Sequence, residues 1–363
     1  MSDLQDRVAD PAGSGGSGEH TVVQPQLPAV APVLVAVVAA AAGIGIGLAL
    51  GFDIAGIVVV AWLLGTLALP IWSVVVEGTR QAKDRLATIL VWTTFAVAAL
   101  PLVAVMYAVL RRGLPAIDGQ FLTYSMDGVL GEGGGIYHAI MGTLIVTGLA
   151  TLISVPIGVM AAIYLVEYGK GNRLARVLTF LVDVMTGIPS IVAGLFALAL
   201  FTLIFGPGVR MGFGGSVALA VLMIPIVVRA TEEMLKLVPD ELREAAYALG
   251  VPKWRTITKV VLPTSAGGIV TGVTLAIARV AGETAPLLLI VGIFRSTNFN
   301  PFDGAMATLP VYIFSEVTRG GLAQYVPFQV ERAWGAALVL IVIVMVLNIL
   351  ARIIGAIFAP KKG

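Results

Sequence analysis

Residues 244–263 read EAAYALGVPKWRTITKVVLP and form a polar, charged insert between two long apolar runs. Its pattern rests on six positions: Glu244, Ala245, Ala246, Gly250, Leu262 and Pro263. Glycine adopts the backbone angles that a tight turn requires, and the small alanines leave room for a neighbouring surface. The insert therefore predicts two short helices joined by a turn that fit closely against another protein.

The composition indicates a membrane protein. The chain is 58% hydrophobic and only 12% charged, and its mean hydropathy is +0.98. A soluble domain carries about 25% charged residues. This balance is typical of a polytopic protein embedded in a lipid bilayer, and it excludes an ordinary soluble enzyme or a nucleic-acid-binding domain.

Apolar runs long enough to cross a bilayer, about 20 residues each, predict an all-α fold with about eight transmembrane helices. They cover residues 31–52, 54–76, 86–110, 139–166, a stretch within 176–206, 215–230, 264–292 and 334–357. The fifth is interrupted by Gly187-Ile188-Pro189, because proline removes a helical hydrogen bond and clashes with the preceding turn.

The ends of the chain are polar. Residues 1–29 are rich in glycine, serine and proline, which predicts a disordered tail. If residues 244–263 face the cytoplasm, 16 of the 23 lysines and arginines lie on that side, against six on the other. This excess follows the positive-inside rule. It places the tail, residues 359–363 and hence both termini in the cytoplasm, and leaves two longer outer loops, 111–138 and 293–333.

Several chemistries are excluded by what the sequence lacks. Cysteine is absent, so disulfides, thiolate metal sites and a cysteine nucleophile are ruled out. Neither His20 nor His138 has a second ligand at metal spacing, so we expect no metal site and no catalytic residues. The GxxxxGK[ST] phosphate loop is also missing. We therefore expect this chain to bind no cofactor and to draw its energy from a partner that binds ATP and Mg.

A buried charge pair is predicted in the seventh run. Arg279 lies near the centre of this run, and Glu283 follows one helical turn along on the same face. Each charge at a helix centre costs about 2.5–3.5 kcal/mol on insertion scales, so the two need a reason. They form either a structural ion pair or a contact for an oxyanion in a translocation path, since a guanidinium matches phosphate or carboxylate oxygens. Gly282 and Pro286 loosen the backbone beside them.

Polar residues near the interrupted fifth run have two interpretations. Ser190 and Thr186 offer hydroxyls either to an anion or to the backbone groups that Pro189 frees. Asp183 is either a polar group near the cytoplasmic interface or a partner of Arg279 or Arg229.

The insert resembles the EAA loop of the membrane subunits of ABC-type importers. That consensus is EAA, three residues, Gly, nine residues, Ile, one residue and Leu-Pro, and only Val260 departs from it here. In that family the loop is a coupling helix that docks on a separate ATPase subunit. The resemblance assigns ATPase coupling to the six positions of the insert.

Two further stretches resemble the PstA-type permease of the phosphate-specific ABC importer. They are GETAPLL at 282–288 and MTGIPSIVAGLF at 185–196. The resemblance covers about residues 86 to 357 and implies a type I importer fold. A six-helix core at 86–358 with a coupling loop at 231–263 would then follow an extra hairpin and linker at 30–85. The implied substrate path contains Arg279, Glu283, Thr284 and Ser190.

The same resemblance implies a bacterial inner-membrane location and a set of partners. These are a homologous PstC-type permease, a PstB-type ATPase dimer, a PstS-type phosphate-binding protein and inorganic phosphate. The PstC type usually reads GETMA where this chain has GETAP. The alternatives are the PstC-type sister subunit, a related permease for molybdate, sulfate or an amino acid, and a secondary transporter or channel.

Overall fold

The computed structural model describes residues 27–169, 171–318 and 323–358, with side chains up to residue 353. Every regular element within these ranges is helical, so the predicted all-α fold is confirmed. The chain divides into two compact units, residues 1–104 and 105–363. Most of the predicted disordered tail, residues 1–26, lies outside the described residues, as do residues 359–363. The proposed core boundary at residue 86 stays a prediction.

The first unit is a helical hairpin followed by a long helix. Its elements are α1 (Ala31–Leu50), α2 (Ile54–Val76) and the first part of α3 (Thr79–Gly113). Asp53 caps α2, because its Oδ1 accepts a hydrogen bond from the Gly56 amide at 2.9 Å. Gly43 lets the helices approach closely, since a Cβ there would lie 2.6 Å from the Cβ of Ala61. The hairpin therefore packs through small residues and exposes large apolar ones.

An ion pair fixes the corner between α2 and α3. The guanidinium of Arg85 donates to Glu77 at 2.7 and 2.8 Å, and the Ser73 hydroxyl and the Leu27 amide donate at 2.6 and 2.7 Å. The bonds from Arg85, then those from Ser73 and Leu27, lower the pKa of Glu77 from 4.5 to about 2. Glu77 therefore stays ionised at neutral pH and holds the start of α3.

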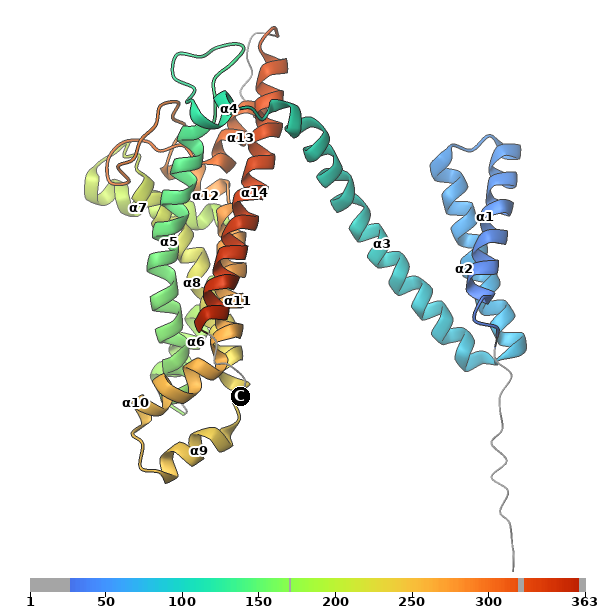
Figure 1. The fold of residues 1–363 in the computed structure, drawn as a ribbon, viewed down its shortest axis with the longest axis horizontal. Helices are drawn as coiled ribbons and strands as arrows, with labels where there is room; N and C mark the ends of the chain where they lie inside the picture. The colour runs from blue at the N-terminus through green and yellow to red at the C-terminus, as the bar shows by residue number, and fades with distance from the viewer. Residues whose placement is uncertain (1–26, 170, 319–322, 359–363) are drawn as a thin grey trace, which may run out of the picture. The chain divides into compact units, whose positions relative to one another are not determined.

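The second unit contains the rest of the chain. Its elements are η1 (Leu114–Ala116), α4 (Gly119–Thr123), α5 (Tyr137–Ile163), η2 (Tyr164–Tyr168), α6 (Arg173–Thr186), α7 (Ser190–Phe205), α8 (Gly212–Lys236), α9 (Asp240–Ala248), α10 (Lys253–Thr256), η3 (Ile257–Val261), α11 (Leu262–Ala281), α12 (Ala285–Ile290), α13 (Leu309–Thr318) and α14 (Val326–Phe358). Helix α8 is central and packs against α5, α7 and α11 (Figure 1). Its Leu219, Met223 and Val227 are fully buried and anchor the core.

The packing of α5 on α8 shows how many times the chain runs from one end of this unit to the other. Gly215 of α8 lies against Val146, and Gly158 farther along α5 lies against Val227 farther along α8, so the two helices run parallel. The chain must therefore return between them, through α6 and α7. Within the described residues, seven helices are long and apolar enough to span a membrane, and the α6–α7 pair, bent by 109°, makes an eighth when it is taken as one broken span. The predicted count of about eight is confirmed.

Two predicted spans are broken. The break at Gly187-Ile188-Pro189 separates α6 from α7, as the proline predicted. The seventh run was predicted as one helix over 264–292. This prediction was wrong, because α11 ends at Ala281 and α12 begins at Ala285. Gly282 and Pro286, the second residue of α12, explain this end. Proline is favoured in the first turn of a helix, and because it has no N–H it cannot donate a hydrogen bond to the turn before it.

The long outer segments are less open than predicted. Residues 293–333 were expected to be a loop, but they contain α13 and the start of α14. Leu309, Val311 and Tyr312 of α13 are buried against the core. The predicted coupling loop also starts too early, because α8 continues to Lys236.

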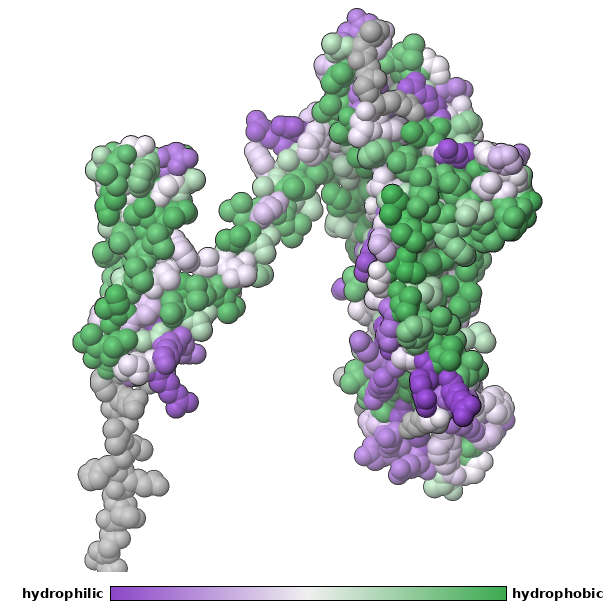
Figure 2. Space-filling model, turned by 180° about the vertical axis from the view of Figure 1, so that it is seen from behind, coloured by the Kyte–Doolittle hydropathy of each residue, from purple (hydrophilic) through white to green (hydrophobic). Residues whose placement is uncertain are grey.

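The surface of the second unit is sorted by polarity. Hydrophobic residues cover its sides, and hydrophilic ones gather at the end that carries α9 and α10 (Figure 2). The C-terminal end of α14 lies at this same end (Figure 1). Apolar sides with polar ends suit a body that crosses a bilayer.

Candidate functional site

Helix α9 carries the EAA pattern and ends in a Schellman turn at Gly250. The Gly250 amide donates to Tyr247 O at 2.9 Å, and the Val251 amide donates to Ala246 O at 3.1 Å. Gly250 has a φ of 75°, a backbone angle that residues other than glycine rarely adopt. A Cβ there would meet nothing within 4 Å. The glycine is thus required for its backbone angle and not for space within this chain.

The second arm of the coupling segment continues into a membrane-spanning helix. Lys253–Ala281 forms one helical run, in which a π-helical turn, η3, separates α10 from α11. Leu262 and Pro263 are the first two residues of α11. A proline removes one backbone donor, and it is tolerated in a first turn. The Leu-Pro pair therefore marks where the π turn gives way to the α-helix.

The coupling segment, residues 240–256, presents small and apolar groups to the outside. Ala246 is buried, whereas Glu244 and Ala245 are exposed. Around them lie exposed large apolar side chains: Leu242, Tyr247, Leu249 and Trp254. Leu249 is 83% exposed, which is costly in water. Such a patch at the polar end of the unit suits a protein partner.

The predicted path residues lie at the two broken helices. Ser190 is the first residue of α7, and Glu283 and Thr284 lie in the break between α11 and α12. All three are partly exposed. The breaks are close in space because α7 packs on α12: a Cβ at Gly194 would lie 2.5 Å from Pro286 Cα. Ser190 is about 6 Å along the helix from Gly194. The fold thus brings these three residues into one region.

Arg279 lies in the last turn of α11 and is exposed. A cation there is favoured by the negative end of the helix dipole. The prediction that Glu283 lies on the same helical face was wrong, because α11 ends between the two residues. A structural ion pair between them, one of the two interpretations, is not among the pairs formed by the described residues. The guanidinium is available to another acceptor.

A chain of charges links α6 to the C-terminal half of α8. Asp183 accepts a hydrogen bond from Arg229, whose other Nη donates to Glu232 at 2.7 Å. Glu232 also binds Lys236 at 2.7 Å. Of the two interpretations of Asp183, the structure therefore selects the partner of Arg229. The pairing holds α6 beside α8, just below the break at Pro189.

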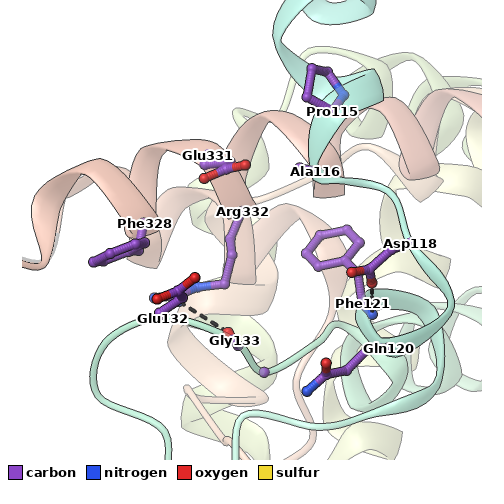
Figure 3. Close-up of a pocket in the computed structure, with 11 residues that line it drawn as sticks. Pro115, Ala116, Asp118, Gln120, Phe121, Glu132, Gly133, Phe328, Glu331 and Arg332 are labelled. Carbon is purple, nitrogen blue, oxygen red and sulfur yellow. Dashed lines mark hydrogen bonds between the residues drawn. The ribbon is translucent and has the colours of Figure 1, made fainter.

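A cavity of about 250 Å³ opens on the side opposite the coupling segment (Figure 3). Arg332 reaches from α14 to the loop beneath it and donates to Gly131 O at 2.6 Å and to Gly133 O at 3.2 Å. It also binds Glu316 of α13 at 3.0 Å, with side chains 7% and 3% exposed. From the sequence, Arg332 was only one of the six basic residues on the predicted outer side. Nothing local in the sequence pairs it with Glu316.

Comparison with known proteins decides the family. Residues 154–363 match the model of the binding-protein-dependent transport system inner membrane component. The phosphate transport system permease protein PstA 1 of Mycobacterium tuberculosis is 49% identical over 278 residues, which are 76% of this chain and 89% of the relative. The chain belongs to the PstA family of permeases. The permease is also 47% identical over 292 residues to PstA of Mycobacterium leprae, covering 79% of this chain and 94% of that one.

A more distant relative agrees. PstA of Yersinia pestis is 41% identical over 289 residues, covering 79% of the permease and 93% of the relative. Among solved structures, a chain of the MetNI methionine ABC transporter aligns with a TM-score of 0.47 and 19% identity, over 62% of the permease and 95% of that chain. The permease is therefore a multi-pass inner-membrane protein of a binding-protein-dependent transport system.

No group of three or more His, Cys, Asp or Glu side chains in the described part of the permease is placed to hold a metal ion. The site offers instead a free guanidinium, hydroxyls and broken helix ends. Groups of this kind suit the binding of an anion.

Proposed function

We propose that the permease is the membrane subunit of an ATP-driven importer that moves inorganic phosphate into the cytoplasm. The observation that carries this proposal is the exposed Arg279 guanidinium beside the break at residues 282–284, with no carboxylate bound to it among the described ion pairs. The phosphate assignment is supported by relatives named phosphate transport permeases at 41–49% identity.

The path chemistry fits a tetrahedral oxyanion. A guanidinium donates two parallel hydrogen bonds to phosphate oxygens. Ser190 heads α7, and the N-terminus of a helix attracts an anion through its free amides and its dipole. Broken helices expose such backbone groups inside a membrane only where they line a cavity or pack in protein. Arg279, Ser190 and Thr284 therefore serve as hydrogen-bond donors to the anion. The Glu283 carboxylate repels the anion and so favours its release.

The energy comes from partner subunits. The permease pairs with a homologous PstC-type permease and with two PstB-type ATPase subunits, which bind ATP and Mg. A PstS-type protein delivers phosphate from the outer side. The exposed patch around Leu249 supports an ATPase docking site at α9 and α10. With the coupling segment in the cytoplasm, the end of α14 lies on the same side.

The experiment measures which oxyanion stimulates ATP hydrolysis by the assembled complex in lipid. We expect phosphate to stimulate it, with its binding protein present, and sulfate and molybdate to leave it at the basal rate. Stimulation by sulfate or molybdate alone would assign the permease to another solute. Phosphate transport by the isolated chain without ATP would point to a secondary transporter or channel.

A further inference from the structure

A buried ion pair joins the coupling segment to a helix far away in the sequence. Arg243 lies in α9, directly before Glu244, and Glu167 lies in η2, the π-helical turn that ends α5. Arg243 donates to Glu167 Oε1 through Nη2 at 2.9 Å and through Nε at 3.1 Å. Both side chains are nearly buried, at 12% and 5% exposed. A pair this well shielded is specific in geometry and is weakly screened by salt.

The same arginine closes the end of α8. Its Nη1 donates to Val238 O at 2.7 Å, and its Nη2 donates to Leu235 O at 2.9 Å. Leu235 lies in the last turn of α8, where the final carbonyls have no donor within the helix, and Val238 follows directly after the helix cap. One guanidinium thus holds the end of α5, the end of α8 and the start of the coupling segment together.

Lys253 brings the second arm of the coupling segment to the same point. It is the first residue of α10, and its Nζ donates to the Glu167 backbone carbonyl. The ammonium also lies 4.8 Å from the centre of the Tyr168 ring. Both α9 and α10 therefore converge on η2.

Along the chain, the coupling segment follows α8 and leads into α11, whereas α5 is separated from it by several helices. Helix α5 nevertheless packs along the whole of α8, where Gly158 leaves room for Val227. We propose that Arg243 and Glu167 are positioning residues that form a clamp, through which movement of the coupling segment is passed to α5. The π turn at η2 suits this role, since such turns recur at functional sites.

The clamp requires an arginine and a carboxylate. Lysine keeps the charge but has no planar fork, so it cannot reach Glu167 and the carbonyls of Leu235 and Val238 at once. Glutamine at 167 keeps an acceptor but loses the charge. We therefore expect Arg243→Lys and Glu167→Gln to weaken the clamp, and Arg243→Ala and Glu167→Ala to break it.

The test measures phosphate moved per ATP hydrolysed by the complete transporter in proteoliposomes. We expect this ratio to fall about tenfold in either alanine variant, within the range of measured couplings, and less in Arg243→Lys and Glu167→Gln. Phosphate-independent ATP hydrolysis and co-purification of the ATPase should stay unchanged. The double alanine variant should be no worse than the worse single variant, because both remove one interaction.

Asp240→Asn is the matched control. Asp240 binds the same guanidinium at 3.1 Å but is 76% exposed, and exposed pairs contribute little. We expect its transport ratio to be unchanged. A ratio that falls equally in Asp240→Asn and Glu167→Ala would contradict a role for the buried link.

A tether separates transmission from folding. The chain contains no cysteine, so Glu167→Cys combined with Arg243→Cys gives one unique pair within it. We expect this variant to be uncoupled when reduced and to regain coupling when a bifunctional thiol reagent joins the two positions. Unchanged coupling in all Glu167 and Arg243 variants, or no recovery with the tether, would overturn the clamp. The clamp rests on the proposed function, which fails separately if the unaltered complex moves no phosphate.

Discussion

At the scale of single residues, Arg279 gives the sharpest test of the anion path. Arg279→Ala removes the guanidinium, and Arg279→Lys keeps only its charge. We expect at least a hundredfold loss of phosphate uptake for alanine and only partial recovery for lysine, because each of the two hydrogen bonds in a bidentate contact to a charged group is worth about 1.5–3 kcal/mol. Labelled phosphate uptake into membrane vesicles measures both.

Arg80→Lys serves as the control for this arginine. Arg80 is also exposed but lies in the first unit, at the start of α3. Its variant should transport normally. Full uptake by Arg279→Lys would show that a point charge suffices and would remove the argument for an oriented oxyanion.

The sequence singled out the candidate path residues but did not predict how they are arranged. Arg279 was recognised because a charge in an apolar run is costly. Its pairing with Glu283 was deduced from helical periodicity, which fails once α11 ends at Ala281. Arg243 and Glu167 escaped notice because each looks like an ordinary charge near a membrane interface. Only the fold brings these two together.

At the scale of elements, the turn after α9 depends on one backbone angle. Gly250→Val forces a β-branched residue to a φ of 75°, which costs on the order of 1–2 kcal/mol or more. The end of α9 should shift while the membrane-spanning helices stay intact. We expect normal insertion, and ATP hydrolysis that phosphate no longer stimulates.

Gly51→Val controls for backbone strain alone. Gly51 has a φ of 68° at the end of α1 and, like Gly250, has open space around it. We expect phosphate-stimulated hydrolysis to survive there. Equal loss of stimulation in both variants would indicate general destabilisation and not a coupling defect.

The ion pair between α13 and α14 is a stability element at the end of the second unit opposite the coupling segment. Glu316→Ala leaves the buried Arg332 without its counter-ion, which costs about 3–5 kcal/mol. We expect the melting temperature of the purified permease to fall. Glu331→Ala, beside it on α14 but exposed, should melt like the unaltered protein. Equal melting of all three would show that the pair contributes nothing.

Elements were predictable where one local rule dominates. Residues 54–76 were predicted as a helix and form α2 with those bounds, because a long apolar run must satisfy its backbone within itself. Helix α13 was missed because ten residues are too few to cross a bilayer, so its segment resembled a loop. Its burial depends on α5 and α14, which no local pattern records.

At the scale of the whole molecule, the permease of the proposed importer forms the translocation path, and a partner subunit supplies the energy. In the described structure, α9 and α10 lie at one end of the second unit and the Arg332 cavity lies at the other (Figure 1, Figure 3). Between them lie the broken helices and Arg279. In the proposed importer, α5, α8 and α11 therefore link the ATPase docking site to the rest of the second unit.

The most direct test of this account is ATP-driven accumulation of labelled phosphate in proteoliposomes that contain the permease with its sister subunit, the ATPase and the binding protein. We predict uptake against a phosphate gradient only when ATP and all four proteins are present, with no accumulation of labelled sulfate or molybdate. Phosphate accumulation without ATP, or equal accumulation of sulfate, would contradict the account.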